Sequence, residues 1–233
     1  MKTKLVKFLK LYSKNLNPPS KINNQRLLSE IEKLLKNNPV KIHLGCGTIY
    51  KEGWINIDSK SNEFPGIDSN KVDIIYDLTN PLPIPDESVD FIFHDNFFEH
   101  LSYDNGLNLL KDHFRILKKG GVVRINQPDL EKVVNFYIRD NFRSLIINGK
   151  PYNEHYAGYA CLRNRAESIN YCFRQFGQHK YLYDFEAMKL RLIDAGFSEN
   201  NIKRCNATIS EFSELLNLER SSDQLSLVIE AIR

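Results

Sequence analysis

A glycine pair after a predicted strand is the first feature of this sequence that could hold a ligand. Ile42-His43-Leu44 is an apolar run that leads directly into Gly45-Cys46-Gly47. Because glycine lacks a Cβ atom, such a turn can bend sharply and let a ligand approach the backbone. Asp58 ends the next apolar run, eleven residues after Gly47, where a carboxylate can accept hydrogen bonds from ribose hydroxyls. Ligands of doubly wound sheets bind at this carboxyl edge of the strands.

The same turn does not match the fingerprint of the nucleotide-dependent dehydrogenases. Their G-x-G-x-x-G pattern needs a third glycine, and Tyr50 stands at that position. Their acidic residue lies roughly 20 residues further on, later than Asp58 does here. The pattern therefore does not favour a nucleotide-dependent dehydrogenase, and an ordinary turn at the end of a strand remains the alternative to a ligand site.

The elements that must position these residues alternate between strands and helices. Several runs are apolar at both odd and even positions, as a parallel sheet buried on both faces requires. The predicted strands are 40–44, 54–57, 72–76, 89–93, 121–126, 202–208 and 225–232. A helix is predicted over about 107–117, a second begins at a cap at Asp129, and a third spans 184–195. The first is predicted to end at Lys118-Lys119-Gly120-Gly121. This alternation predicts an open α/β sheet.

Taken in chain order, further motifs make the sequence resemble the class I S-adenosylmethionine (SAM)-dependent methyltransferases, in particular their methyltransferase type 11 branch. The matching segments are LGCG at 44–47, GWINID at 53–58, DL at 77–78, PLPIPDESVDFIF at 81–93, EHL at 99–101, LKKGGVVRINQPD at 117–129, HKYLYD at 179–184 and AGF at 195–197. The resemblance implies a Rossmann-like seven-stranded sheet, mostly parallel with the last strand antiparallel, and helices on both faces. It implies SAM as cofactor and S-adenosylhomocysteine as product.

The resemblance also implies roles for individual residues. The backbone of Gly45, Cys46 and Gly47 would face the methionine part of the cofactor, and Asp58 would hold the ribose. At the adenine, Asp77 would accept from the amino group and the Leu78 amide would donate to a ring nitrogen. His94 would lie near the sulfonium, with Asn96 close by. One departure is that only residues 48–53 link Gly47 to Trp54, so the first crossover must be shortened to about a turn.

The acceptor is predicted from weaker signals. A hydroxyl acceptor benefits from a nearby base, and the candidates are His94, Asp95, Asp129, His155 and His179. The N/D-P-P-Y/F motif of amino-group methylases is absent, since the chain reads His94-Asp95-Asn96-Phe97 at that place. Residues 139–178 are predicted to be an inserted helical or lid segment, whose tyrosines and arginines suit a sugar or a phosphate-bearing acceptor. We therefore expect O-methylation of a glycan or another small hydroxyl acceptor, in polysaccharide modification.

Charge and composition leave two alternatives open. Residues 1–41 hold ten Lys and Arg and two acidic residues, whereas the chain as a whole has a net charge of +3. This basic N-terminal helical arm, residues 1–38 ahead of a methyltransferase domain at 39–233, could contact the phosphates of an RNA substrate or, through residues 1–14, weakly contact a membrane surface. A non-catalytic SAM-binding protein is the second alternative. The four cysteines lack C-x-x-C spacing, so we expect no metal site and a cytoplasmic location. The sequence does not indicate an oligomeric state.

Overall fold

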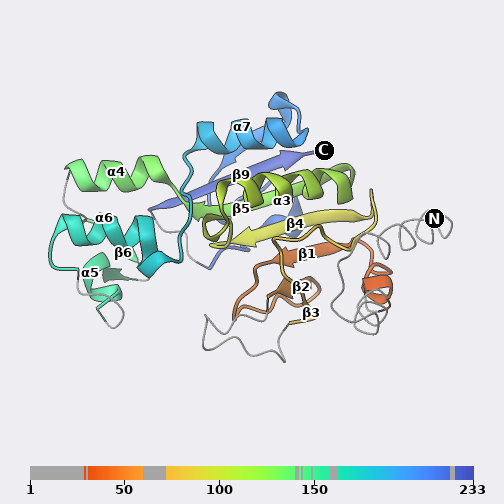
Figure 1. The fold of residues 1–233 in the computed structure, drawn as a ribbon, viewed down its shortest axis with the longest axis horizontal. Coiled ribbons are helices and arrows are strands. Elements are labelled where there is room, and N and C mark those ends of the chain that lie inside the picture. The colour runs from red at the N-terminus through yellow and green to blue at the C-terminus, as the bar shows by residue number, and fades with distance from the viewer. Residues whose placement is uncertain are drawn as a thin grey trace.

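The computed structural model describes residues 29, 31–59, 72–139, 142, 144–147, 149–157, 162–220 and 224–233. At its centre lies a seven-stranded sheet with the strand order β3-β2-β1-β4-β5-β9-β8 (Figure 1). The strands are β1 (Lys41–Leu44), β2 (Ile55–Asp58), β3 (Ile74–Ile75), β4 (Val89–Asp95), β5 (Leu117–Pro128), β8 (Ile202–Cys205) and β9 (Ser226–Ile232). β1 to β5 pair in parallel, and β9 runs antiparallel between β5 and β8. The predicted seven-stranded, mostly parallel sheet is confirmed.

One face of the sheet is covered by α3 (Tyr103–Ile116) and α7 (Phe185–Ala195). The side chain of Ser102 caps α3, and that of Asp184 caps α7 by accepting from the Ala187 amide at 2.8 Å. Gly196 ends α7 with a φ of 114°, and a Cβ atom there would lie 3.1 Å from the ring of Phe114. Glycine is thus required both for the backbone conformation and for close packing against α3.

The end of α3 differs from the prediction. Lys118-Lys119-Gly120-Gly121 does not form the last turn and cap of the helix, because α3 ends at Ile116 and β5 begins at Leu117. Lys118 instead pairs with Asp90 of β4 at 2.6 Å. β5 therefore starts four residues earlier than the apolar run at 121–126 suggested.

The opposite face of the sheet is covered by residues 206–220, which include the short 3-10 helix η5 (Ser213–Leu215). Arg124 of β5 is fully buried beneath this segment, where it pairs with Glu219 and Glu230 at 2.5 Å each. Its guanidinium also donates to the carbonyl oxygens of Asn206 and Ile209. One buried cation therefore fastens the covering segment to the sheet.

The short link between β1 and β2 is held by Asn56. Its side-chain amide donates to the carbonyl oxygens of Lys51 and Trp54, and its side-chain oxygen accepts from the Lys51 amide at 2.9 Å. The link consists of turns, as expected from its six residues. Asn56 thereby satisfies backbone groups that a crossover helix would have paired within itself.

The predicted insertion forms a small subdomain after α4 (Leu130–Arg139). It contains β6 (Ile146–Ile147), β7 (Lys150–Pro151), α5 (Tyr152–His155), α6 (Arg165–Arg174) and η3 (Gln175–Gly177). It packs around a cluster of its own, in which the Tyr152 hydroxyl lies 2.9 Å from the Cys172 Sγ. Figure 1 shows this subdomain beyond the arrowheads of β1 and β4, at the carboxyl edge of the sheet.

The N-terminal arm falls almost entirely outside the described residues, including the predicted membrane contact at 1–14 and the charged run up to residue 28. Residues 31–34 are helical, and Ile31 packs into the main core. Within the described part of the chain, none of the helices combines the length and hydropathy that crossing a membrane would need.

Candidate functional site

The glycine turn and Asp58 lie next to each other at the carboxyl edge of the sheet. Gly45 continues the pairing of β1, since its amide donates to the Ile57 carbonyl at 2.9 Å. One carboxylate oxygen of Asp58 accepts from the Gly47 amide at 2.6 Å, and the other accepts from the Ser59 amide at 2.6 Å. Burial is the main cause that raises the pKa of Asp58, against these two hydrogen bonds. Each oxygen keeps a further acceptor position, because a carboxylate can accept about four hydrogen bonds.

The two glycines of the turn have different neighbours. Both have positive φ, 65° at Gly45 and 54° at Gly47. A Cβ atom on Gly45 would lie 2.1 Å from the ring of Phe97, so close packing by Phe97 alone requires glycine there. A Cβ atom on Gly47 would meet nothing within 4 Å. The open space that a nucleoside cofactor needs is therefore on the Gly47 side, next to Asp58, and the residues present fit such a group.

Asp77 and Leu78 follow β3 at the same edge. One oxygen of Asp77 accepts from both the amide and the hydroxyl of Thr79, at 2.9 and 2.7 Å, which fixes the turn after the strand. Asp77 is exposed and Leu78 is buried in the main core. Their predicted adenine contacts stay predictions. The neighbouring segment 60–71 lies outside the described residues.

His94 does not lie where the sequence analysis expected it. Its ring is fully buried under α3, where its Nε2 lies 2.5 Å from the Nε2 of His113, and the ring of Phe97 stacks on it at 5.5 Å. Burial lowers the pKa of His113 to about 3 and lowers that of His94 well below its usual range. The predicted contact of His94 with the sulfonium and its role as a base do not fit this position, because the alternation of β4 turns its side chain into the core.

Asp95 and Asn96 end β4 at the carboxyl edge. Asp95 is buried on the face opposite to His94, where it accepts from the Asn126 side chain at 2.8 Å and pairs with Arg220 at 3.2 Å. These partners give Asp95 a structural role in fixing the covering segment, and its role as a general base stays a prediction. Asn96 has a positive φ of 52°, and its amide donates to the Asn126 carbonyl, so the chain turns sharply toward the glycine turn.

Two further candidate bases have partners of their own in the structure. Asp129 is buried at the start of α4, where it accepts from the Glu131 amide and pairs with Arg204 at 2.5 Å. That ion pair fits a cap rather than a base. His155 lies on α5 in the subdomain, edge-on to the ring of Tyr156. No described contact joins His155 to the glycine turn.

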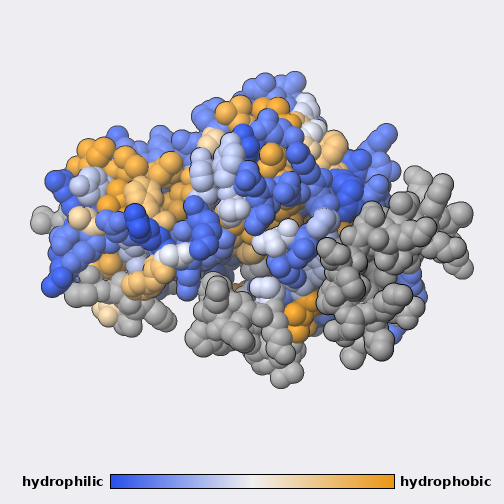
Figure 2. All heavy atoms as spheres, viewed as in Figure 1, coloured by the Kyte–Doolittle hydropathy of each residue, from blue (hydrophilic) through white to orange (hydrophobic). Residues whose placement is uncertain are grey.

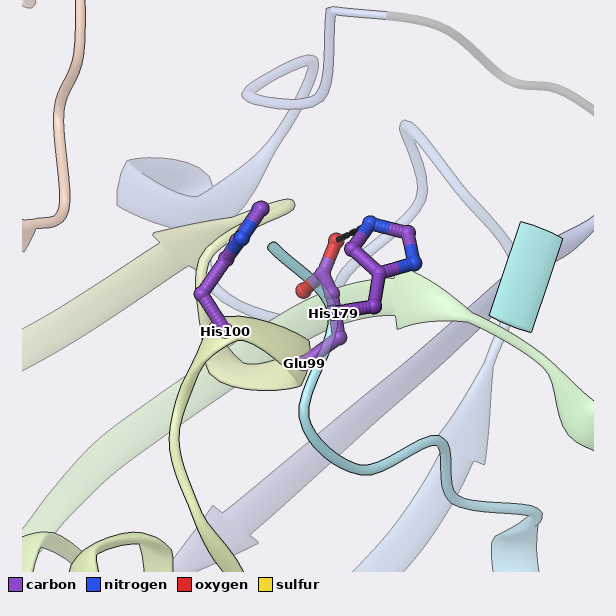
Figure 3. A group of neighbouring side chains, drawn as sticks. All are labelled: Glu99, His100 and His179. Carbon is purple, nitrogen blue, oxygen red and sulfur yellow. Dashed lines mark ion pairs between the residues drawn. The ribbon is translucent and has the colours of Figure 1, made fainter. Parts of the chain in front are cut away.

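His179, another predicted base, lies at the carboxyl edge beside two further titratable side chains. It lies beside Glu99 and His100 of η2 (Phe98–His100), the 3-10 turn that follows β4 (Figure 3). Its Nε2 is 4.0 Å from a Glu99 oxygen, and its ring meets that of His100 edge-on at 5.0 Å. Burial lowers the pKa of His179 and lowers that of His100 to about 4, so both rings are neutral near pH 7. The sequence analysis did not bring these three residues together.

Comparisons with known proteins show what the chain and its fold are similar to. Residues 52–125 match the family model described as a methyltransferase domain, and no curated protein matches the chain. A solved SAM-dependent methyltransferase from Archaeoglobus fulgidus is 17% identical, with 92% of this chain and 95% of that one covered and a TM-score of 0.51. Others are from Thermotoga maritima (20% identity, 88% of each chain, TM-score 0.47) and Mesorhizobium loti (15% identity, 83% and 90%, TM-score 0.47). The fold is thus shared with SAM-dependent methyltransferases.

Proposed function

Because residues 52–125 match a methyltransferase domain and the fold is shared with a solved SAM-dependent methyltransferase, we propose that this chain transfers the methyl group of SAM to a hydroxyl group of a saccharide or another small acceptor. Binding of SAM is supported by one observation: Gly47, which has open space beside its Cα, lies next to the carboxylate of Asp58. A ribose diol can donate to the acceptor positions that Asp58 keeps. The methionine part would then follow the turn at residues 45–47.

The reaction depends more on the alignment of its two reactants than on reactive groups of the protein. The acceptor oxygen attacks the methyl carbon, the carbon–sulfur bond breaks, and its electron pair stays on sulfur to give S-adenosylhomocysteine. The hydroxyl proton leaves to a base or to solvent. The sulfonium supplies the reactivity, so the protein contributes by holding the two reactants in line and excluding water.

The subdomain at the carboxyl edge supports a saccharide-like acceptor. Phe176 of η3 is 72% exposed and Tyr181 is 39% exposed, and both lie close in sequence to His179. Exposed aromatic rings of this kind can pack against the apolar faces of sugars. Figure 2 shows hydrophobic residues gathered at the surface over α4 and the subdomain. Ile138 of α4 is 67% exposed.

Other members of the predicted aromatic lid pack or pair within the subdomain. Tyr152 is buried in the core of the subdomain, Arg165 stacks on Tyr137, and Arg163 pairs with Glu167. Tyr159 lies outside the described residues. An acceptor would therefore meet the exposed rings near η3 and not the whole set that the sequence indicated.

The test has two stages on the full chain. Calorimetry with SAM and with S-adenosylhomocysteine asks whether the cofactor binds, and absence of binding would remove the proposal. Turnover with methyl-labelled SAM against RNA, protein, lipid and polysaccharide fractions then identifies the acceptor. Label in the polysaccharide or glycolipid fraction supports the proposal. Label confined to RNA would favour the basic arm as a substrate contact instead.

A further inference from the structure

We propose that Glu99, His100 and His179 form a binding site for a divalent transition-metal ion, with Zn²⁺ the ion that the donor set suits best. One ligand atom from each of the three side chains lies within 4.8 Å of the other two. Figure 3 shows the Glu99 carboxylate between the two imidazole rings. Two histidines and one carboxylate are a common ligand set of catalytic zinc sites.

The backbone holds the three ligands in place. Glu99 and His100 are consecutive residues of η2, and η2 follows β4 directly. The chain after His179 is tied to the same turn, because the amides of Lys180 and Tyr181 both donate to the Glu99 carbonyl, at 2.8 and 3.3 Å. The meeting of the three side chains is thus fixed by main-chain hydrogen bonds and does not depend on a surface rotamer.

Two backbone carbonyl groups beside the cluster hold both imidazoles in the form that binds a metal. The Nδ1 of His179 donates to the Cys172 carbonyl at 2.6 Å, and the Nδ1 of His100 donates to the Gln178 carbonyl at 3.3 Å. With the ring proton on Nδ1, the lone pair lies on Nε2, which for His179 is the atom that faces Glu99. A ligating histidine almost always donates its other ring N–H to a carbonyl or carboxylate in this way.

The spacing suits a site that closes slightly around its ion. Bonds of about 2.1 Å in a tetrahedral arrangement place donor atoms about 3.4 Å apart. The Glu99 oxygen and the His179 Nε2 are 4.0 Å apart, so binding would draw them together by about half an ångström. The side chains of Glu99 and His179 are only 1% and 8% exposed, so an ion bound between them would be largely shielded from solvent.

Three protein ligands leave a fourth position for water or for a substrate oxygen. Phe97, which packs on Gly45, is only two residues before Glu99, so the ligand cluster adjoins the glycine turn. An acceptor hydroxyl bound at the fourth position would have its pKa lowered by the ion, as metal-bound water does. The hydroxyl proton would leave to solvent and the resulting alkoxide would attack the methyl carbon. This role rests on the proposed function, whereas the metal site itself does not.

The cluster also explains why the sequence analysis expected no metal. His179 is 79 residues after His100, and no short spacing motif joins them. The hydrogen bonds from the Lys180 and Tyr181 amides to the Glu99 carbonyl bring the two parts of the chain together.

The binding test uses the full chain after treatment with a chelator and dialysis. Co²⁺ is titrated and followed by its visible absorption, and Zn²⁺ affinity is measured by competition with a chromogenic chelator. We expect one equivalent of each ion to bind. Glu99→Gln and His179→Asn should each weaken Zn²⁺ binding by at least about a hundredfold, more than the loss of an outer-shell partner costs. His155→Asn, which removes a histidine outside the cluster, should leave the affinity unchanged.

The proposal fails if the unaltered chain binds no stoichiometric Zn²⁺, or if the two ligand variants bind it as tightly as His155→Asn does. Thermal melting of each variant shows whether a loss of binding reflects unfolding. SAM titration of the same samples separates the two claims. A chain that binds SAM but no metal overturns the metal site alone, and one that binds Zn²⁺ but no SAM overturns the proposed function alone.

Discussion

Replacing Asp58 by asparagine tests the proposed contact with the ribose of SAM with the least change of side-chain shape. In the native chain each Asp58 oxygen already accepts one backbone N–H at 2.6 Å, from Gly47 on one side and Ser59 on the other. An asparagine keeps one acceptor oxygen and turns an NH₂ group toward the second N–H. The variant thus loses the charge and leaves one backbone donor facing another donor.

The expected magnitude follows from these contacts. Hydrogen bonds to a charged group contribute about 1.5–3 kcal/mol each, so loss of the charge-assisted bond to the ribose should weaken SAM binding about ten- to a hundredfold. The mismatched N–H should lower the free energy of unfolding by about 1–3 kcal/mol. Part of that loss is offset, because the variant no longer buries the charge whose desolvation raises the pKa of Asp58.

Two measurements separate these effects. Calorimetry gives the SAM affinity at a temperature where the variant is folded, and urea denaturation without ligand gives its stability. Asp86→Asn is the matched control, since Asp86 is a surface residue paired with Arg115 and its loss should change neither value by more than about 1 kcal/mol. An Asp58→Asn chain that binds SAM as the unaltered chain does would refute the placement of the ribose.

Further predictions concern the turn, the buried histidines and the covering segment. Gly47→Ala should fold with a backbone strain of about 1 kcal/mol yet bind SAM weakly. Gly45→Ala should lower the free energy of unfolding by about 1–3 kcal/mol, because its methyl group would clash with the ring of Phe97. Melting curves compare the stability of the two variants, and calorimetry compares their SAM affinity. The neutral form of His113 stabilises the fold fully above pH 6.5 and loses that contribution toward its pKa of about 3. Urea denaturation should therefore show about 2 kcal/mol less stability from this residue at pH 5 than at pH 6.5, and a flat profile would contradict its burial. Arg124→Met should cost about 3–5 kcal/mol in the same assay because it leaves the Glu219 carboxylate buried without its cation, and a near-native stability would show that the ion pair does not fasten this segment.

The sheet could be predicted from the sequence because its buried strands carry a strong local signal. The run Phe91–Phe93, for example, is apolar at both parities and forms part of a central strand. The caps at Asp184 and Gly196 were equally local. The start of β5 was missed because Lys118 and Gly120 resemble a helix end, whereas pairing with a neighbouring strand decides their conformation.

The positions of the candidate site residues could be predicted only where the order and ends of the strands determine them. Gly47 and Asp58 follow from the ends of two adjacent strands. His94 was misplaced because alternation along β4 tells which residues share a face, but not that its face meets α3 and His113. The grouping of Glu99 with His179 depends on long-range main-chain pairing, which no local pattern encodes.

The fastening of residues 206–220 by Arg124 has a consequence for the order in which the chain can mature during synthesis. The glycine turn and β4 leave the ribosome early, but Glu219, Glu230 and the whole of β9 are made more than a hundred residues after Asp95. Until residues 206–220 are made, the ring of Phe93 and the guanidinium of Arg124 are exposed to solvent. The nascent chain therefore cannot acquire its cofactor-binding form in stages from the N-terminal side, and it must stay unaggregated until its last strand is available.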